Sequence, residues 1–301
     1  MMVRHFYCLT IIYKFTYHPT MNIHNMIEID FSKRHSFPGT TGNSFDNLLH
    51  AFILIERIPL PIYVFFLLIL SFLPRPTDFY MVTIRWLFSL IDLALLAGLP
   101  LSGKSFGPAK PPVLILSVFR TLISLFPLFI SLPLQVIGTL LVIYGFWIEP
   151  HCIGVTKQTF QSKKISPGKI IRILHIGDLH VERITKREQQ LNQLIRNLNP
   201  DLILFSGDFL NLSYRKDPIA IEAVRSLIME WHARYGTFGV TGSPAVDLPE
   251  VIPNLIEGLP LVLLDDQIQS LSIDGQEINI IGLTCSHKPF IDGPILKTLL
   301  S

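Results

Sequence analysis

Three side chains in the second half of the sequence have the types and the spacing of metal ligands. Asp178 and His180 belong to the segment HIGDLH, and Asp208 belongs to SGDFLN; each segment includes the end of an apolar run. An Asp-x-His pair offers a carboxylate oxygen and an imidazole from one loop, while an aspartate from a neighbouring loop could bridge two divalent ions. Gly177 and Gly207 precede the two aspartates and allow sharp backbone turns. These residues predict a metal site.

The elements around these residues predict that both aspartates lie at one edge of a β-sheet. The apolar runs 170–176 and 201–206 are typical of strands, and a helical pattern with one apolar face lies between them. Ligand sites in α/β sheets form outside the carboxyl ends of strands, which is where Asp178 and Asp208 stand. A second interpretation stays open, in which the two aspartates only cap the helices that follow them.

Residues 169–301 as a whole have the pattern of an α/β layer fold. Short β-rich runs alternate with helical periodicity, and an amphipathic helix is expected around residues 220–231. A polar linker, residues 156–168, is expected to precede this region. Further strands are expected at 236–241, 261–264, 268–273 and 278–283, with a hairpin turn at Asp274 and Gly275 and a last helical turn before Ser301.

The segment GDLH, followed about 30 residues later by GDFLN, resembles the opening of calcineurin-like metallophosphoesterases. The resemblance covers about residues 171–300 and is strongest to the subgroup whose phosphoesterase domain follows membrane spans. It implies a layered β-sheet flanked by helices, with Asp178 and His180 on a first metal, Asp208 as the bridging ligand and Asn211 bracing the loop. It also implies a divalent cofactor of the Mn, Fe or Zn type and a phosphomonoester or phosphodiester substrate.

The sequence departs from the family pattern after the third strand of this region. The resemblance implies a Gly-Asn-His-Asp/Glu segment there, but the chain reads TGSPAVD, with Ser243 and Pro244 in place of Asn and His. A serine hydroxyl is a poorer ligand, and proline has no side-chain donor. Asp247 either approaches the site or caps the helix that begins LPEVIP, and we expect the cap.

The family's closing motifs, Gly-His and Gly-His-x-His, do not occur before Ser301. His287, in TCSHKPF, stands too early to replace them and is expected to be a surface or structural residue. We therefore expect an incomplete domain that holds one divalent ion weakly and hydrolyses phosphoesters poorly. The alternatives are a non-catalytic, membrane-tethered binding or scaffold module and a truncated gene product.

The first half of the chain has the composition of a membrane protein. The whole chain is 49% hydrophobic and only 16% charged, with a mean hydropathy of +0.45, whereas soluble domains are about 25% charged. We expect a multi-span α-helical region at 51–150 in contact with the lipid bilayer, or three spans and a re-entrant segment. The four expected spans are 58–74, 80–100, 112–130 and 132–148.

Two charges lie deep inside the expected spans, and the segment before these spans has little pattern. Asp92 and Arg120 are expected to pair; their role is either helix packing, with Arg120 reaching toward the interface, or a transport or lipid site. Residues 1–50 are expected to form a poorly ordered tail. The small net charge of +2 argues against nucleic acid as a partner, and three scattered cysteines predict free thiols.

The distribution of Lys and Arg predicts the sidedness of the chain. With four spans, most of these charges lie on one side, which places the C-terminal half in the cytoplasm. Three spans would instead put the tail and the C-terminal half on opposite sides. The richer side would hold Arg57, Lys104, Lys110, Lys157, Lys163 and Lys164, and the other side Arg75 and Arg85.

Overall fold

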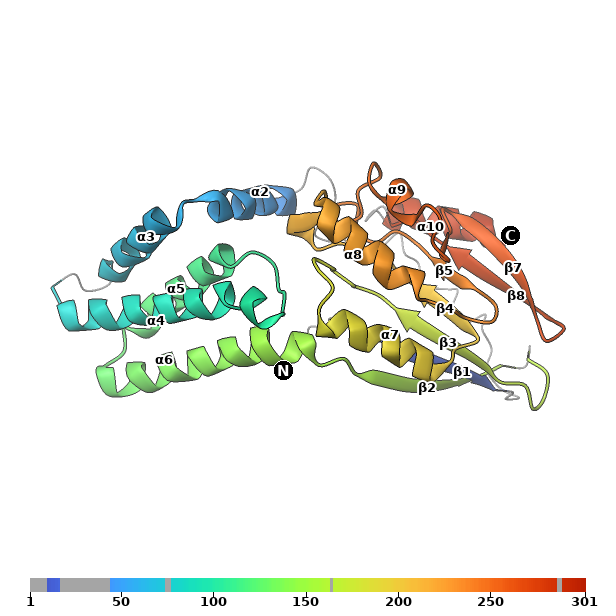
Figure 1. Ribbon diagram of the computed structural model, residues 1–301, viewed down its shortest axis with the longest axis horizontal. Coiled ribbons are helices and arrows are strands. Elements are labelled where there is room, and N and C mark those ends of the chain that lie inside the picture. Colours follow the sequence, from blue (N-terminus) through green and yellow to red (C-terminus); the bar gives the residue numbers. More distant parts are fainter. Residues whose placement is uncertain (1–9, 17–43, 74–76, 163–164, 286–288) are drawn as a thin grey trace. The chain divides into compact units, whose positions relative to one another are not determined.

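The computed structural model describes residues 10–16, 44–73, 77–162, 165–285 and 289–301 (Figure 1). The chain divides into two compact units. The first, here called the sheet unit, comprises Met1–Asp46 and Ile153–Ser301, and the second, the helical unit, comprises Asn47–Cys152.

A mostly parallel sheet forms the centre of the sheet unit. Its strand order is β2-β1-β3-β4-β5-β6, in which every neighbouring pair is parallel except β1 and β3. The run from β3 to β6 is parallel, which agrees with the α/β layer fold expected for residues 169–301. The strands are β1 (Thr10–Thr16), β2 (Val155–Gln161), β3 (Ile171–Ile176), β4 (Leu202–Phe205), β5 (Thr237–Gly239) and β6 (Val262–Leu263).

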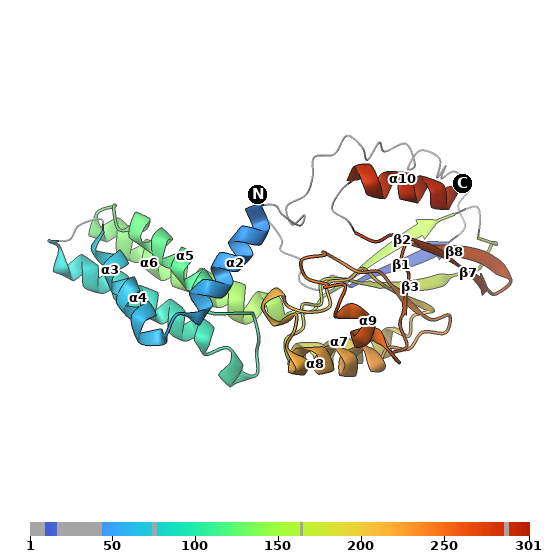
Figure 2. The same ribbon diagram turned by 90° about the horizontal axis from the view of Figure 1, so that it is seen from above.

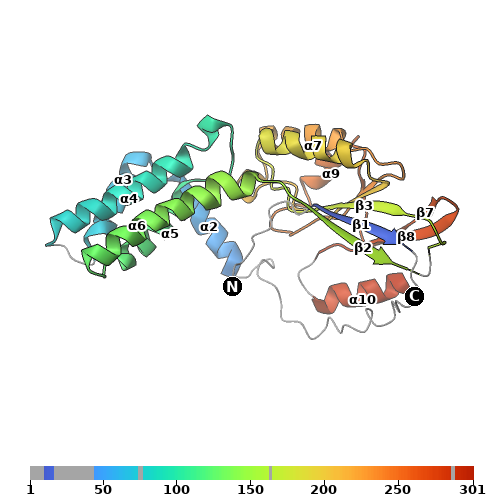
Figure 3. The same ribbon diagram turned by 90° about the horizontal axis from the view of Figure 1, so that it is seen from below.

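Both faces of the sheet are covered. Helices α7 (Lys186–Leu198), α8 (Pro218–Met229) and α9 (Ile252–Ile256) lie on one face, and α10 (Pro289–Leu300) lies on the opposite side (Figures 2 and 3). The core under α7 to α9 includes Leu174, Ile203 and Phe205. A separate core joins Ile171, Ile173 and Leu202 to the antiparallel hairpin of β7 (Gln267–Ile273) and β8 (Gln276–Gly282).

Local sequence signals explain where the helices of the sheet unit begin and end. Thr185 and Glu188 form a capping box at the start of α7, and Asn199 ends that helix in a left-handed conformation with φ of 43°. Asp217 caps α8 by accepting a hydrogen bond from the amide of Ile219. β3 and β4 therefore each lead through a capped helix to the next parallel strand.

Two strands lie where no regular structure was expected. β2 occupies the first part of the predicted linker 156–168, and β1 lies inside the predicted tail 1–50, where helix α2 (Ser44–Arg57) also begins. The sequences VTKQTFQ and TIIYKFT are rich in β-branched and aromatic residues, which favour strands. The rest of the predicted tail, 1–9 and 17–43, lies outside the described residues.

Apolar helices occur at all four positions where spans were expected. The boundary between the third and fourth helices differs from the prediction. α5 ends at Ile123, before the expected end of the third span, and Pro133 lies inside α6 rather than near its start. Phe126 precedes Pro127, and a residue before proline disfavours the helical conformation. The helices are α3 (Leu60–Phe72), α4 (Phe79–Ala97), α5 (Lys110–Ile123) and α6 (Leu128–Val142), which continues through a π-helical segment (Ile143–Ile148) and a short 3-10 turn (Glu149–His151).

The lengths of these helices support fewer spans than four. Among the described residues, Phe79–Ala97 and Leu128–His151 are long and apolar enough to cross a membrane, and the pair Ala51–Arg57 and Leu60–Phe72, bent by 111°, could form a third span. α3 and α5 have 13 and 14 residues. At about 1.5 Å per residue, neither alone crosses a hydrocarbon core of about 30 Å.

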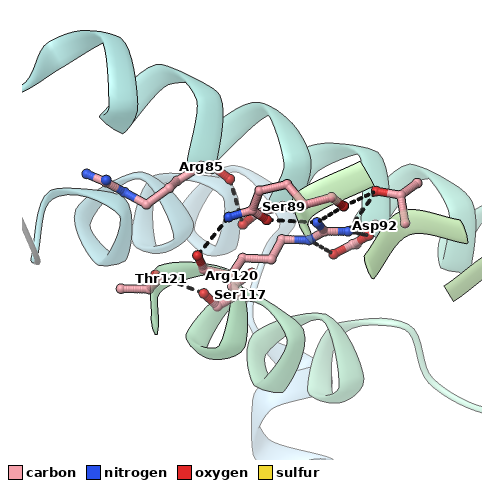
Figure 4. A network of polar contacts seen from close by, with 8 residues as sticks. Arg85, Ser89, Asp92, Ser117, Arg120 and Thr121 are labelled. Atoms are coloured by element: carbon pink, nitrogen blue, oxygen red, sulfur yellow. Dashed lines mark hydrogen bonds and ion pairs between the residues drawn. The ribbon is translucent and has the colours of Figure 1, made fainter. Parts of the chain in front are cut away.

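The expected pairing of Asp92 with Arg120 is confirmed (Figure 4). The Nε and Nη2 atoms of Arg120 donate to the two carboxylate oxygens of Asp92 at 2.5 and 2.6 Å. The remaining guanidinium hydrogens are donated to Gln135 and Thr139. Arg120 is 3% exposed, so it does not extend toward the surface, and every N–H of its guanidinium has an acceptor.

Candidate metal centre

The parallel pairing of β3 with β4 continues beyond the strands and carries the candidate ligands. Ile176 pairs with Phe205 at the end of the two strands. Beyond them, the amides of Asp178, His180 and Val181 donate to carbonyls of the neighbouring loop. Both loops therefore leave the carboxyl ends of their strands in register, as the sequence predicted.

Asp178, His180 and Asp208 come together at this edge. One ligand atom from each side chain lies within 4.8 Å of those from the other two. His180 Nε2 lies 3.6 Å from Asp208 Oδ2. In the part of the chain that the structure describes, this is the group of histidine, cysteine or acidic residues that could hold a metal ion.

All three side chains project from backbone in the left-handed region. The φ angles of Asp178, His180 and Asp208 are 53°, 44° and 61°. Aspartate and histidine tolerate this region better than most residues, but such conformations still cost free energy. Strained residues gather at functional sites when the surrounding structure holds them in place, and the paired loops do so here.

Gly207 is required by the close approach of two loops. Its φ is 90°, and a Cβ at this position would lie 2.0 Å from the amide nitrogen of Gly242. Gly177 has a different role from the predicted turn, because a Cβ there would lie 2.4 Å from the hydroxyl oxygen of Ser206. Both glycines allow backbones to pack closely beneath the candidate ligands.

The electrostatics of the group favour a bound cation. Burial, and then the negative charge of Asp208, raise the pKa of Asp178 above its usual value. His180 Nδ1 lies 3.4 Å from the carbonyl oxygen of Leu210. If Nδ1 donates to that carbonyl, Nε2 keeps the lone pair that a metal ligand needs. A divalent ion would relieve the repulsion between the two carboxylates.

The distances also fit a divalent ion. Oxygen and nitrogen ligands lie about 2.0–2.2 Å from Zn²⁺ or Mg²⁺, so two ligands of one ion are at most about 4.4 Å apart. The separations within 4.8 Å need only small side-chain movements to meet this limit. Two carboxylates and one imidazole are a ligand set that suits Mn, Fe or Zn ions.

Neither Asp178 nor Asp208 caps a helix, so the capping interpretation was wrong. Thr185 and Asp217 cap α7 and α8. Asn211 accepts a hydrogen bond from the amide of Ser213 at 3.0 Å, at the start of the short 3-10 helix Leu212–Tyr214. It thereby braces the loop after β4.

The segment after β5 approaches Asp208 although it lacks the expected Asn and His. The amide of Ser243 donates to Asp208 Oδ1 at 2.9 Å. The helix cap expected of Asp247 was wrong, because α9 begins at Ile252 without a side-chain cap. Asp247 is buried beside the Asp208 loop instead, and burial raises its pKa to about 6 against the opposing effect of three amide donors.

Other sequence predictions about side chains have mixed outcomes. His287 lies outside the described residues, so its expected surface or structural role stays a prediction. Of the described residues, Cys152 and Cys285 are thiols outside any disulfide, as predicted, whereas Cys8 lies outside the described residues.

Comparison with known proteins agrees with this site. The family model of calcineurin-like phosphoesterases matches residues 171–242, which include all three candidate ligands. The chain is similar to the UDP-2,3-diacylglucosamine pyrophosphatase LpxG of Chlamydia trachomatis, with 28% identity over 99 residues that cover 32% of this chain and 29% of LpxG. It is also similar to the uncharacterized metallophosphoesterase YkoQ of Bacillus subtilis, with 24% identity over 127 residues that cover 41% of this chain and 46% of YkoQ.

The matched region is limited to part of each protein. The chain spans less than half the length of these two curated relatives. No solved structure gives a significant match. The two motifs, the parallel sheet that carries them and the family match together identify residues 171–242 as part of a calcineurin-like phosphoesterase domain.

Proposed function

We propose that this chain is a membrane-anchored, metal-dependent phosphoesterase in which Asp178, His180 and Asp208 hold a divalent ion. The observation that carries the proposal is the convergence of these three side chains within 4.8 Å at the carboxyl ends of β3 and β4. The family match over the same residues supports phosphoester hydrolysis as the reaction class.

The metal would supply Lewis-acid chemistry, activating water and neutralising charge on the phosphoryl group. This chain's residues have the task of holding and orienting it. Asp208 is the ligand best placed to be shared between two ions, because it faces His180 with one oxygen and accepts from Ser243 with the other. We propose that these residues hold one ion, and weakly, since the described part of the chain brings three ligands together and three are the minimum for a stable site.

The substrate class is a phosphomonoester or phosphodiester. The name of LpxG describes cleavage of a diphosphate in a diacylated nucleotide sugar, so a diphosphate belongs in any substrate panel. Ser243 and Pro244 stand where the family resemblance implies a metal-binding Asn and an acid/base His. We propose that turnover is low for this reason, since general acid–base catalysis contributes about 10²- to 10⁴-fold.

We propose that α4 and α6 anchor the chain in a bilayer, with the sheet unit on the cytoplasmic side. The length and apolarity of these helices support spanning. Large apolar side chains such as Phe129, Leu140 and Leu141 are exposed along α6, and contact with lipid would cover them. With α4 and α6 as the spans, the Lys and Arg residues on the side of the sheet unit outnumber those between the spans, and this excess supports the orientation. The first group includes Arg57, Arg75, Lys157, Lys163 and Lys164, and the second is Lys104, Lys110 and the buried Arg120.

A second candidate is a non-catalytic binding module. It is favoured by Ser243 and Pro244, which provide neither a strong ligand nor a proton donor. Such a module would bind Mn²⁺ or a phosphate ester without turning it over.

Hydrolysis assays on the purified full chain separate these functions. The panel is bis-p-nitrophenyl phosphate, p-nitrophenyl phosphate and a nucleoside diphosphate sugar, each with Mn²⁺. The enzyme proposal predicts slow, metal-dependent turnover that Asp208→Ala abolishes and that the control Asp201→Asn leaves unchanged, since Asp201 stands at the opposite end of β4. Absence of turnover above the Asp208→Ala background on all three substrates would favour the binding module.

A further inference from the structure

The carboxylate of Asp247 accepts hydrogen bonds from three backbone amides, two in the loop after β4 and one in the loop after β5. Oδ2 accepts from the amides of Asp208 and Gly242, both at 2.7 Å, and Oδ1 accepts from the amide of Phe209 at 2.9 Å. Asp247 itself is 2% exposed. A buried carboxylate is costly unless it is well bonded, so these contacts are what keep it there.

These hydrogen bonds fix the backbone of a candidate metal ligand. Asp208 has a φ of 61°, a conformation that needs support from its surroundings. Its amide is held by Asp247, and its Oδ1 is held by the amide of Ser243 at 2.9 Å. Its Oδ2 is the oxygen that faces His180 Nε2. The loop after β5 thus holds Asp208 at both its backbone and its side chain.

The fit between the two loops is tight. A Cβ on Gly242 would lie 2.3 Å from Asp208 Oδ1 and 2.5 Å from the Asp208 amide nitrogen. The side chain of Arg215 donates to the carbonyl oxygen of Ala245 at 2.5 Å and holds the same loop from another side. A shift of Asp247 would therefore move Asp208 as well.

We propose that Asp247 is a positioning residue of the metal site, because its buried carboxylate ties the Asp208 loop to the loop after β5 and so keeps Asp208 in the geometry of a ligand. This inference rests on the proposed metal site. Asp247 is not itself among the three converging ligands, and both of its oxygens already accept amide hydrogens. The segment from Gly242 to Asp247 supports the site through the carboxylate of Asp247 and the amide of Ser243.

The test compares Mn²⁺ binding by the full chain in detergent with binding by Asp247→Asn and Asp247→Glu. Asparagine keeps the size of the side chain but places an amide NH₂ against backbone donors, and glutamate keeps the charge on a longer stem. Loss of support around a ligand typically weakens metal affinity about 10- to 100-fold, so Asp247→Asn should raise the Kd for Mn²⁺ by that factor and Asp247→Glu by less. Asp201→Asn, which removes one oxygen acceptor for the Arg172 amide at the far end of β4, is the control.

Three measurements keep the outcomes distinct. Electron paramagnetic resonance gives the Kd and the spectrum of bound Mn²⁺, which should change in Asp247→Asn, and metal-free thermal unfolding gives the temperature range in which each variant is folded. If Asp247→Asn does not fold, Asp247→Glu provides the comparison. Parent-like Kd and spectrum in folded Asp247→Asn, or in folded Asp247→Glu where Asp247→Asn does not fold, would overturn the inference alone. No Mn²⁺ binding by the parent chain would overturn the proposed metal site and the inference with it.

Discussion

At the scale of single residues, the proposed metal site consists of three candidate ligands and a further residue, Asp247, that contacts one of them. Asp178, His180 and Asp208 are recognisable because each stands within a few residues of a strand end. Asp247 contacts Asp208 across 39 positions, and an aspartate before a short helix has the local pattern of a cap. Only the packing of two loops reveals its actual partners.

The glycine that separates the loops gives a prediction at the same scale. Gly207→Ala should destabilise the chain by more than Gly275→Ala and should abolish Mn²⁺ binding. Both glycines have a positive φ. A Cβ at Gly207 would clash with the backbone of Gly242, whereas a Cβ at Gly275 would have nothing within 4 Å. The positive φ alone costs about 1–2 kcal/mol, so the clash is the difference between the variants.

Thermal unfolding and Mn²⁺ titration of both variants check this prediction. Equal unfolding temperatures of the two variants, or parent-like Mn²⁺ binding by Gly207→Ala, would contradict it. Either result would show that the close contact between the two loops is not required for stability or for metal binding.

At the scale of elements, periodicity predicted the parallel strands and their helices, and it failed for β1 and β2. The strands β3 to β8 and the helices α7 and α8 lie within a few residues of their predicted positions, because apolar runs and caps are local signals. Thr10–Thr16 pairs with strands more than 140 residues later in the chain, which no local pattern can indicate. Likewise, α5 ends at Ile123, although the apolar run continues beyond that residue.

The strand β3 contains a histidine that makes stability depend on pH. Burial lowers the pKa of His175 below its usual 6.5. The folded state therefore binds fewer protons at His175 than the unfolded state does. The contribution of neutral His175 to the free energy of unfolding is complete above about pH 6.5 and is lost as the pH falls through the folded pKa. The unfolding temperature of the parent should fall more between about pH 7.5 and 5.5 than that of His175→Gln, which cannot titrate. An identical fall in both proteins would contradict this assignment.

The ion pair of Asp92 and Arg120 holds α4 against α5. Every guanidinium donor of Arg120 already has an acceptor in the protein, which favours this structural role over a ligand site. Asp92→Ala should cost about 3–5 kcal/mol, since it leaves a buried cation without its acid. Replacing both residues by leucine should restore much of the loss. Asp78→Ala, which removes only the cap of α4, should cost about 1 kcal/mol and serves as the control. Unfolding temperatures in detergent measure these differences. A parent-like unfolding temperature of Asp92→Ala would show that the ion pair does not stabilise the helices.

At the scale of the whole molecule, a family-matched sheet unit and an apolar helical unit share one chain. The composition predicted both regions, whereas the number of spans depended on helix ends that composition does not define. The two long apolar helices are the features that favour membrane anchoring. The proposed function requires both units, one for the metal site and the other for attachment.

The membrane anchor is tested by fractionation of cells that express the full chain. It should pellet with membranes and remain there in alkaline carbonate, and a reporter active only in the cytoplasm should function when fused after Ser301. Release into the soluble fraction without detergent would contradict the anchor. Labelling of the reporter from outside intact cells would contradict only the orientation.

The most direct test of the account is a Mn²⁺ titration of the purified chain, followed by electron paramagnetic resonance. Asp178, His180 and Asp208 should bind one Mn²⁺ ion per chain, and the bound signal should disappear in Asp208→Ala but remain in Asp201→Asn. The reason is that removal of one of three ligands leaves fewer than a stable site requires. No saturable Mn²⁺ binding by the parent chain, or binding that survives Asp208→Ala unchanged, would contradict the metal site on which the proposed function depends.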